Sequence, residues 1–191
     1  MPAYAYAILG VGWLVWVTPF VLRYAKRNTG QLAKLDRRAR WGMLFMAIAY
    51  ALLWQGRFWT RSPGPWRIAV SLLLFVVASV LSWTSTRALG RHWRFDAGLD
   101  ADHELVRSGP YRVVRHPIYT SMFCMLLGTG LLLATPLPLL LPSILLLAIG
   151  TEIRVRIEDR LLASRFGDHF RDYQRRVSAY IPFLIIRRHA R

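Results

Sequence analysis

Residues 105–119, with the sequence LVRSGPYRVVRHPIY, run directly into a long apolar segment. The stretch holds three arginines, a histidine, two tyrosines and two prolines next to a run with the composition of a membrane span. Ionisable groups are costly at that depth, so they mark a functional site by default. The pattern predicts a site that binds a charged, water-soluble cofactor at the membrane surface, beside an apolar substrate.

The composition of the whole chain supports a membrane protein. Its 191 residues are 54% hydrophobic, with a mean hydropathy of +0.29, yet carry a formal charge of +16. This is too apolar for an ordinary soluble domain of that charge, unless the apolar residues cluster in spans and the charges lie between them. The single cysteine, Cys124, lies inside an apolar run. It excludes an internal disulfide and a cysteine-cluster zinc site, and we predict no metal site.

Five apolar segments are candidates for the roughly 20-residue helix that crosses a bilayer. They are residues 4–22, 41–54, 66–83, 117–134 and 137–153. The turn at residues 135–138 is so short that the last two segments are expected to form a tight helical hairpin. The Gly10-Val-Gly12 pair lies inside the first segment, with no strand before it, so it is not a Rossmann fingerprint.

The fifth segment has no helix breaker after Ile153, and we expect its helix to continue into the cytoplasm. Phe166, Phe170, Tyr173 and Val177 then recur at helical spacing and predict one apolar face of a helix at the membrane interface. The predicted fold is therefore an all-α integral membrane protein. It has about five transmembrane helices, a C-terminal interfacial or cytoplasmic helix, and no Rossmann domain.

The basic residues predict the orientation. Seven Lys and Arg lie within residues 23–40, six within 87–115 and ten after residue 153, against three within 57–67. With five spans, the three rich segments share one side, which is cytoplasmic by the positive-inside rule. The N-terminus is then outside, and the C-terminus and active site are cytoplasmic. Because the arginines flank apolar spans, anionic lipid headgroups are the expected partners and nucleic acid is not.

Several short motifs follow one another through the second half of the chain. Leu105-Val106, Gly109-Pro110-Tyr111-Arg112 and Arg115-His116-Pro117-Ile118-Tyr119 are followed by Glu158-Asp159, Phe166-Gly167, Tyr173 and Pro182. In order and spacing they resemble the signature of the isoprenylcysteine carboxyl methyltransferase family. That family belongs to a broader group of membrane methyltransferases, which includes phospholipid and thiol methyltransferases. The resemblance implies a methyltransferase-like region at residues 89–191 and a three-span membrane region at 1–88, where acceptor selectivity would lie.

The resemblance implies S-adenosylmethionine as the cofactor and assigns residues to it. His103, Leu105 and Val106 would hold the adenine end. Tyr111, His116 and Tyr119 would line the cofactor, and Glu158 would bind its polar end. A carboxylate suits that role, because it makes strong charge-assisted hydrogen bonds to an amino group or to ribose hydroxyls.

The acceptor is expected to be lipophilic and to enter sideways from the bilayer, most simply as the carboxylate of an isoprenylated cysteine or something similar. Such an anion needs a cation to orient it, and Arg115 and Arg154 are the catalytic candidates. Arg154 and Glu158 are four residues apart and share a helix face. A phospholipid amine or a small thiol is the alternative acceptor, and a non-catalytic basic membrane scaffold is the alternative function.

Some positions depart from the family pattern or fall outside it. Ser121 stands where the family often has glycine, so Thr120 and Ser121 are expected to narrow the cofactor pocket. Asp159 replaces the second glutamate of the usual pair, which leaves its role open. His92 and His169 have no motif around them and are expected to lie on the surface.

Overall fold

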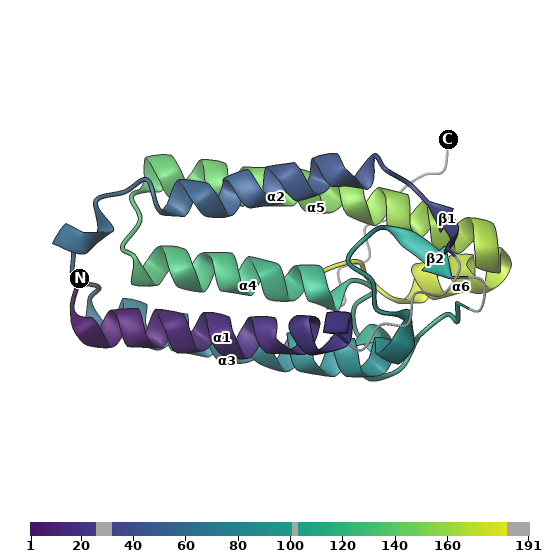
Figure 1. Cartoon of the computed structure of the whole chain (residues 1–191), viewed down its shortest axis with the longest axis horizontal. Coiled ribbons are helices and arrows are strands. Elements are labelled where there is room, and N and C mark those ends of the chain that lie inside the picture. The colour runs from purple at the N-terminus through teal and green to yellow at the C-terminus, as the bar shows by residue number, and fades with distance from the viewer. Residues whose placement is uncertain (26–31, 101–102, 183–191) are drawn as a thin grey trace.

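The structure, a computed structural model, describes residues 1–25, 32–100 and 103–182. Long helices run side by side along one axis (Figure 1). They are α1 (Ala3–Ala25), α2 (Ala39–Leu53), α3 (Pro65–Leu89), α4 (Pro117–Leu132) and α5 (Leu137–Phe166). The predicted all-α fold and the five helical segments are confirmed, and α5 continues well past Ile153, as expected.

The apolar helices make the chain a multi-pass membrane protein. α1, α5 and α3 with the turn that follows it (Pro65–His92) are long and apolar enough to cross a membrane. α4 has 16 residues and α2 has 15, which is shorter than the roughly 20 residues of a full span. Both lie alongside the longer helices in the bundle (Figure 1).

Small residues let the helices approach closely. The ring of Phe75 on α3 fills the space beside two glycines, since a Cβ on Gly12 or on Gly128 would lie 2.7 Å from it. Gly130 likewise makes room for Leu140. The helices therefore pack closely at Gly128 and at Gly130. The expected tight hairpin is not, because α4 packs mainly on α3, and α5 mainly on α2.

One end of the bundle carries most of the polar structure, and we call it the polar end. A short antiparallel ribbon lies there, formed by β1 (Leu32–Leu35) and β2 (Gly98–Asp100). Two 3-10 turns, η2 (Gly90–His92) and η3 (Gly109–Arg112), flank the loop between α3 and α4.

The turn η1 (Phe58–Thr60) lies between α2 and α3. There Arg61 donates a 2.8 Å hydrogen bond to the carbonyl of Ala134, just after α4.

The last helix, α6 (Asp168–Arg176), is separate from α5. Gly167 has φ +53° and ψ −126°, a positive-φ conformation that favours glycine, and the chain turns there. The prediction that Phe166, Phe170, Tyr173 and Val177 share one continuous helix face is wrong for this reason. Phe170 and Tyr173 are buried against the protein by α6, whereas Phe166 ends α5 and Val177 follows α6.

Residues 177–182 form a segment that we call the C-terminal strap. It crosses the start of α4, where Val114 and Ser178 form a parallel bridge. The backbone N–H of Arg115 donates to the carbonyl of Ser178 at 2.8 Å, and that of His116 to Ala179 at 3.0 Å. The strap therefore holds the beginning of α4 by backbone contacts that no side-chain pattern in the sequence indicates.

Candidate active site

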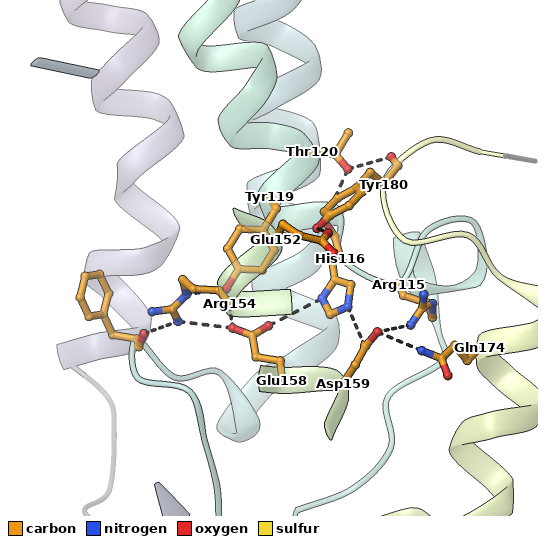
Figure 2. Close-up of polar contacts among 11 residues, drawn as sticks. Arg115, His116, Tyr119, Thr120, Glu152, Arg154, Glu158, Asp159, Gln174 and Tyr180 are labelled. Atoms are coloured by element: carbon orange, nitrogen blue, oxygen red, sulfur yellow. Dashed lines mark hydrogen bonds and ion pairs between the residues drawn. The ribbon is translucent and has the colours of Figure 1, made fainter. Parts of the chain in front are cut away.

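The motif at residues 109–119 folds as a turn followed by a helix start. Gly109, at φ +58°, opens η3, and His116 is the N-cap of α4 with Pro117 in the first turn, where proline costs no hydrogen bond. His116 and Tyr119 are three residues apart and project from this end of α4 toward α5 (Figure 2). On α5 they meet Arg154, Glu158 and Asp159.

Tyr119, Glu158 and Arg154 form one hydrogen-bonded group. The Tyr119 hydroxyl donates to Glu158 Oε1 and accepts from Arg154 Nε at 2.7 Å. Arg154 Nη2 also lies 3.4 Å from Glu158 Oε1 and donates to the carbonyl of Phe95 at 2.8 Å. The tyrosine thus fixes the carboxylate and the guanidinium relative to each other, which confirms the shared helix face of Arg154 and Glu158.

Arg154 reaches this group because two glycines let α2 and α5 touch. A Cβ on Gly42 would lie 2.6 Å from both the Gly150 carbonyl and Arg154 Cγ, so only glycine fits beside them. The arginine is 6% exposed, and its Nη1 has no hydrogen-bond partner in the described part of the chain. A buried guanidinium nitrogen left unpaired is costly, which makes Arg154 a candidate to bind a ligand group in the cavity that it lines.

A second group forms around Asp159. Its Oδ2 accepts from Arg115 Nη1 at 2.7 Å and from Gln174 Nε2 at 3.1 Å, and its Oδ1 lies 2.9 Å from His116 Nε2. Arg115 Nε donates to the carbonyl of Val177, at the start of the strap, at 3.0 Å. Asp159 therefore ties together the start of α4, α6 and the strap.

His116 connects the two groups. Its Nδ1 is 3.6 Å from Glu158 Oε2, while its Nε2 faces Asp159 (Figure 2). The imidazole is 7% exposed and lies between two carboxylates. The strap and α6 are therefore connected to Glu158 by contacts through Asp159 and His116.

Two buried phenols lie beside these groups. The Tyr173 hydroxyl donates to the carbonyl of Tyr111 at 2.5 Å, which fixes α6 on η3. Burial raises the pKa of Tyr173 to about 12, although Arg115 opposes the shift. Burial, with Glu158 nearby, also raises the pKa of Tyr111 well above its ordinary value. Both phenols therefore stay protonated at neutral pH and act as neutral groups.

A cavity of about 660 Å³ adjoins all these residues. This is within the usual range for small-molecule sites. Every residue predicted from the sequence for cofactor or catalysis lines it: His103, Leu105, Val106, Tyr111, Arg115, His116, Tyr119, Arg154 and Glu158. The cavity also has an apolar arm between α1 and α2, lined by Trp13, Trp16, Phe20, Met43, Met46 and Tyr50. One space thus joins a charged end to an apolar end.

Aromatic side chains close the far end of the apolar arm. Trp13 and Tyr50 meet edge to face, with ring centroids 5.3 Å apart. Trp13 Nε1 donates to Thr129 Oγ1 at 3.1 Å, and the Tyr50 hydroxyl donates to the carbonyl of Met122 at 2.7 Å. Both rings are thereby fixed to α4 across the arm.

Two sequence-based expectations about this region are wrong. His92 was expected on the surface, but it is buried, lines the cavity and packs against His103 with ring centroids 4.9 Å apart. Ser121 was expected to narrow the pocket together with Thr120. Instead Ser121 accepts a 3.1 Å hydrogen bond from Trp16 Nε1 between α1 and α4, and neither residue lines the cavity. His169 is exposed, as expected.

The loop before the motif contributes more to the cavity than the sequence indicates. Residues 92–99 line the cavity, and the Phe95 carbonyl accepts a hydrogen bond from Arg154. Backbone groups carry no residue signature, so a sequence pattern could not indicate this contact. The signal that was available was the absence of a span between residues 89 and 116, which leaves a long segment beside the site.

Comparison with known proteins identifies the family. The phospholipid methyltransferase family model matches residues 66–169, more than half of the chain, and the chain belongs to that family. The family implies a methyl donor. The matched region contains α3, α4, α5 and the charged end of the cavity, whereas the α1 and α2 residues of the apolar arm lie outside it.

Individual relatives agree with this. The chain is 31% identical to a protein-S-isoprenylcysteine O-methyltransferase of Tribolium castaneum over 62% of this chain and 43% of that protein. It is 33% identical to the cobalt-zinc-cadmium resistance protein CzcN of Cupriavidus metallidurans, over 65% of each chain. The solved structure of a eukaryotic intramembrane Ras methyltransferase, isoprenylcysteine carboxyl methyltransferase, superimposes with a TM-score of 0.58 at 30% identity. It covers 64% of this chain and 44% of that one.

The chain thus spans less than half the length of the Tribolium castaneum methyltransferase and of the solved structure. The region that the family model matches carries most of the motifs and the charged residues Arg115, Arg154 and Glu158 of the cavity.

Proposed function

We propose that this protein transfers a methyl group from S-adenosylmethionine to a lipophilic acceptor that carries a carboxylate, such as an isoprenylated cysteine or a molecule of that shape. The observation that supports this most directly is the single cavity that joins the Arg154–Tyr119–Glu158 group to the apolar arm between α1 and α2. A water-soluble methyl donor and a membrane-soluble acceptor need a site of this composition.

The residues at the charged end suit S-adenosylmethionine. Its amino group and ribose hydroxyls are donors that a fixed carboxylate such as Glu158 accepts well. Its adenine is a neutral aromatic ring, which suits the part of the cavity lined by His92, His103, Leu105 and Val106. Buried, protonated Tyr111 adds a neutral wall that does not compete for the donor groups.

When bound, the cofactor supplies an electrophilic methyl group on a sulfonium; an acceptor oxygen forms the new bond as the carbon–sulfur bond breaks, and its negative charge is lost. Such a displacement needs alignment and exclusion of water more than acid–base catalysis. The buried guanidinium of Arg154 can hold the acceptor carboxylate through Nη1, while Tyr119 and the Phe95 carbonyl fix the rest of the group.

Of the two arginines predicted as catalytic, Arg154 is better placed for the acceptor. Arg115 already uses Nε on the Val177 carbonyl and Nη1 on Asp159. We therefore propose that Arg154 binds the acceptor and that Arg115 is a positioning residue for the strap.

The acceptor would reach the cavity from the bilayer, between α1 and α2. These two helices pack mainly on other partners, α1 on α3 and α2 on α5. The polar end would face the cytoplasm, where the cofactor is available, as the distribution of basic residues predicts. Anionic lipid headgroups would contact the basic residues around this end.

Calorimetry with S-adenosylhomocysteine on the detergent-purified protein tests the proposal at its first step. Binding with one site per chain is expected. A folded protein that does not bind the product at millimolar concentration would instead support the non-catalytic scaffold and remove the methyltransferase assignment.

A further inference from the structure

A second hollow lies between α4 and α5 and belongs to no part of the proposed mechanism. Its volume is about 790 Å³, and we call it the α4–α5 groove. It exists because α4 packs mainly on α3 and α5 mainly on α2, so the two consecutive helices do not close on each other. Its lining residues are Thr120, Phe123, Ala148, Ile149, Thr151, Glu152, Ile153, Arg156, Tyr180 and Ile181.

The groove shares no lining residue with the active-site cavity. On α4 the cavity uses Ile118, Tyr119 and Met122, whereas the groove uses Thr120 and Phe123. The two hollows therefore lie on different sides of α4. A ligand in the groove cannot be the methyl donor or the acceptor of the proposed reaction.

The walls of the groove change from apolar to charged along α5. Ala148 and Ile149 lie within the apolar part of the helix and are exposed. About two turns after Ile149, Arg156 Nε donates to Glu152 Oε1 at 2.7 Å, and the arginine side chain is 60% exposed. The change from apolar wall to exposed guanidinium is the change that a bilayer makes between acyl chains and headgroups.

The α5 wall of the groove contains a buried hydroxyl group. Thr151 is 1% exposed, and its Oγ1 has no hydrogen-bond partner in the described part of the chain. A buried hydroxyl without a hydrogen-bond partner is unusual in the core of a folded protein. Because this atom is inaccessible, a ligand in the groove would contact the apolar side chains around it and not the hydroxyl itself.

We propose that the α4–α5 groove binds one glycerophospholipid of the surrounding membrane, with an acyl chain along Phe123 and Ile149 and its phosphate diester on Arg156. An arginine matches a phosphate well, because its planar fork donates two parallel hydrogen bonds. The long side chain can keep its charge at headgroup level while its stem lies on apolar surface. This lipid is a structural ligand, separate from the methyl acceptor.

The bound lipid would also stabilise the C-terminal strap. Tyr180 and Ile181 of the strap form one side of the groove, and the Tyr180 hydroxyl lies 3.2 Å from Glu152 Oε2. The carbonyl of Tyr180 accepts from Thr120 Oγ1 at 2.9 Å, and its ring lies 6.4 Å from that of His116. Filling the groove therefore holds the strap against His116. This coupling, unlike the lipid site itself, rests on the proposed function.

Photocrosslinking tests the site without any assay of activity. The probe is phosphatidylcholine with a diazirine on one acyl chain, added to the detergent-purified protein, and the labelled peptides are identified by mass spectrometry. Label is expected on α4 and α5 around Phe123 and Ile149. Unlabelled phosphatidylcholine should compete at least about tenfold better than diacylglycerol, which lacks the phosphate, since a charge-assisted contact is lost.

Variants give the test its controls. Ala148→Phe fills the groove and should abolish the label, whereas Ala7→Phe, at an exposed alanine of α1, should leave it unchanged. Arg156→Gln should weaken competition by phosphatidylcholine about tenfold, and Arg160→Gln, one turn further along α5, should not. Equal competition by diacylglycerol, or label spread evenly over the apolar surface of the bundle, would overturn the lipid site.

Hydrogen exchange measures the coupling separately. Amides of residues 178–181 should exchange more slowly when phosphatidylcholine is added to the wild type, and not when it is added to Ala148→Phe. If the lipid slows exchange in neither protein while crosslinking persists, the coupling between the groove and the strap is wrong and the lipid site still stands. Binding of S-adenosylhomocysteine, measured on the same samples, shows independently whether the proposed function itself holds.

Discussion

Gly42 of α2 and Gly150 of α5 touch backbone to backbone, because a Cβ on either would lie 2.6 Å from the carbonyl oxygen of the other. This contact brings α2 against the helix that carries Arg154, Glu158 and Asp159. It also leaves room for the stem of Arg154 to pass beside α2 into the cavity. A pair of residues without side chains thus determines where the charged end of the site lies.

Gly42→Ala should destabilise the protein, because the added methyl has no space beside Gly150 and Arg154. Overpacking of this kind costs about 1–3 kcal/mol. Thermal unfolding in detergent should show a lower Tm for Gly42→Ala. Gly10→Ala is the matched control, since its Cβ meets nothing within 4 Å, and it should unfold at or slightly above the wild-type temperature. Equal Tm values for all three proteins would contradict the close α2–α5 contact.

Glu158→Gln should weaken cofactor binding. The change removes the charge that Tyr119 and Arg154 hold in place, and loss of one charge-assisted hydrogen bond costs about 1.5–3 kcal/mol, or roughly tenfold or more in affinity. Calorimetry with S-adenosylhomocysteine measures this. Asp168→Asn, at an exposed carboxylate of α6, is the control and should bind like the wild type. Unchanged affinity in folded Glu158→Gln would show that its role is misassigned.

Arg154→Lys and Arg115→Lys should differ in their effects. Lysine keeps the charge but cannot contact Tyr119, the Phe95 carbonyl and an acceptor together, so Arg154→Lys should lower kcat about a hundredfold, with cofactor affinity retained. Arg115→Lys should mainly loosen the strap, seen as faster hydrogen exchange at residues 178–180. A larger loss of turnover from Arg115→Lys than from Arg154→Lys would reverse the two assigned roles.

The orientation can be checked with single cysteines, because Cys124 is the only cysteine in the chain. In a Cys124→Ser background, Ser62→Cys between α2 and α3 should react with an impermeant maleimide in intact cells. Ser108→Cys, at the polar end, should react only after permeabilisation, because the five-span prediction puts 23 of the 26 basic residues on its side. Labelling of Ser108→Cys in intact cells would place the site outside.

The sequence correctly predicts the helices and which residues line the cavity, and the reason is physical. Long apolar runs can satisfy their backbone in a membrane only as helices, so each run indicates its own structure. His116, Tyr119 and Glu158 belong to motifs with fixed spacing, and helix geometry brings such residues to one end of the bundle. Their assignment to cofactor binding stays a prediction that the experiments above test.

What the sequence could not predict depends on contacts between distant segments. His92 looked like a surface residue because nothing near it in the sequence shows that residues 92–99 fold over the cavity. Gly167 lies within the stretch predicted as one helix face, and only its positive φ in the structure reveals the break before α6. Ser121 was placed in the pocket by analogy, whereas its neighbour is Trp16, 105 positions earlier in the chain.

Transfer of a radiolabelled methyl group from S-adenosylmethionine tests the central claim most directly. The acceptors to compare are an S-farnesylated cysteine carboxylate, phosphatidylethanolamine and a small alkyl thiol, each with the wild type and with Arg154→Lys. The account predicts a base-labile methyl ester on the prenylated carboxylate, formed by the wild type and almost lost in Arg154→Lys. Label found only on the lipid amine, and undiminished in Arg154→Lys, would contradict the carboxylate acceptor and the role given to Arg154.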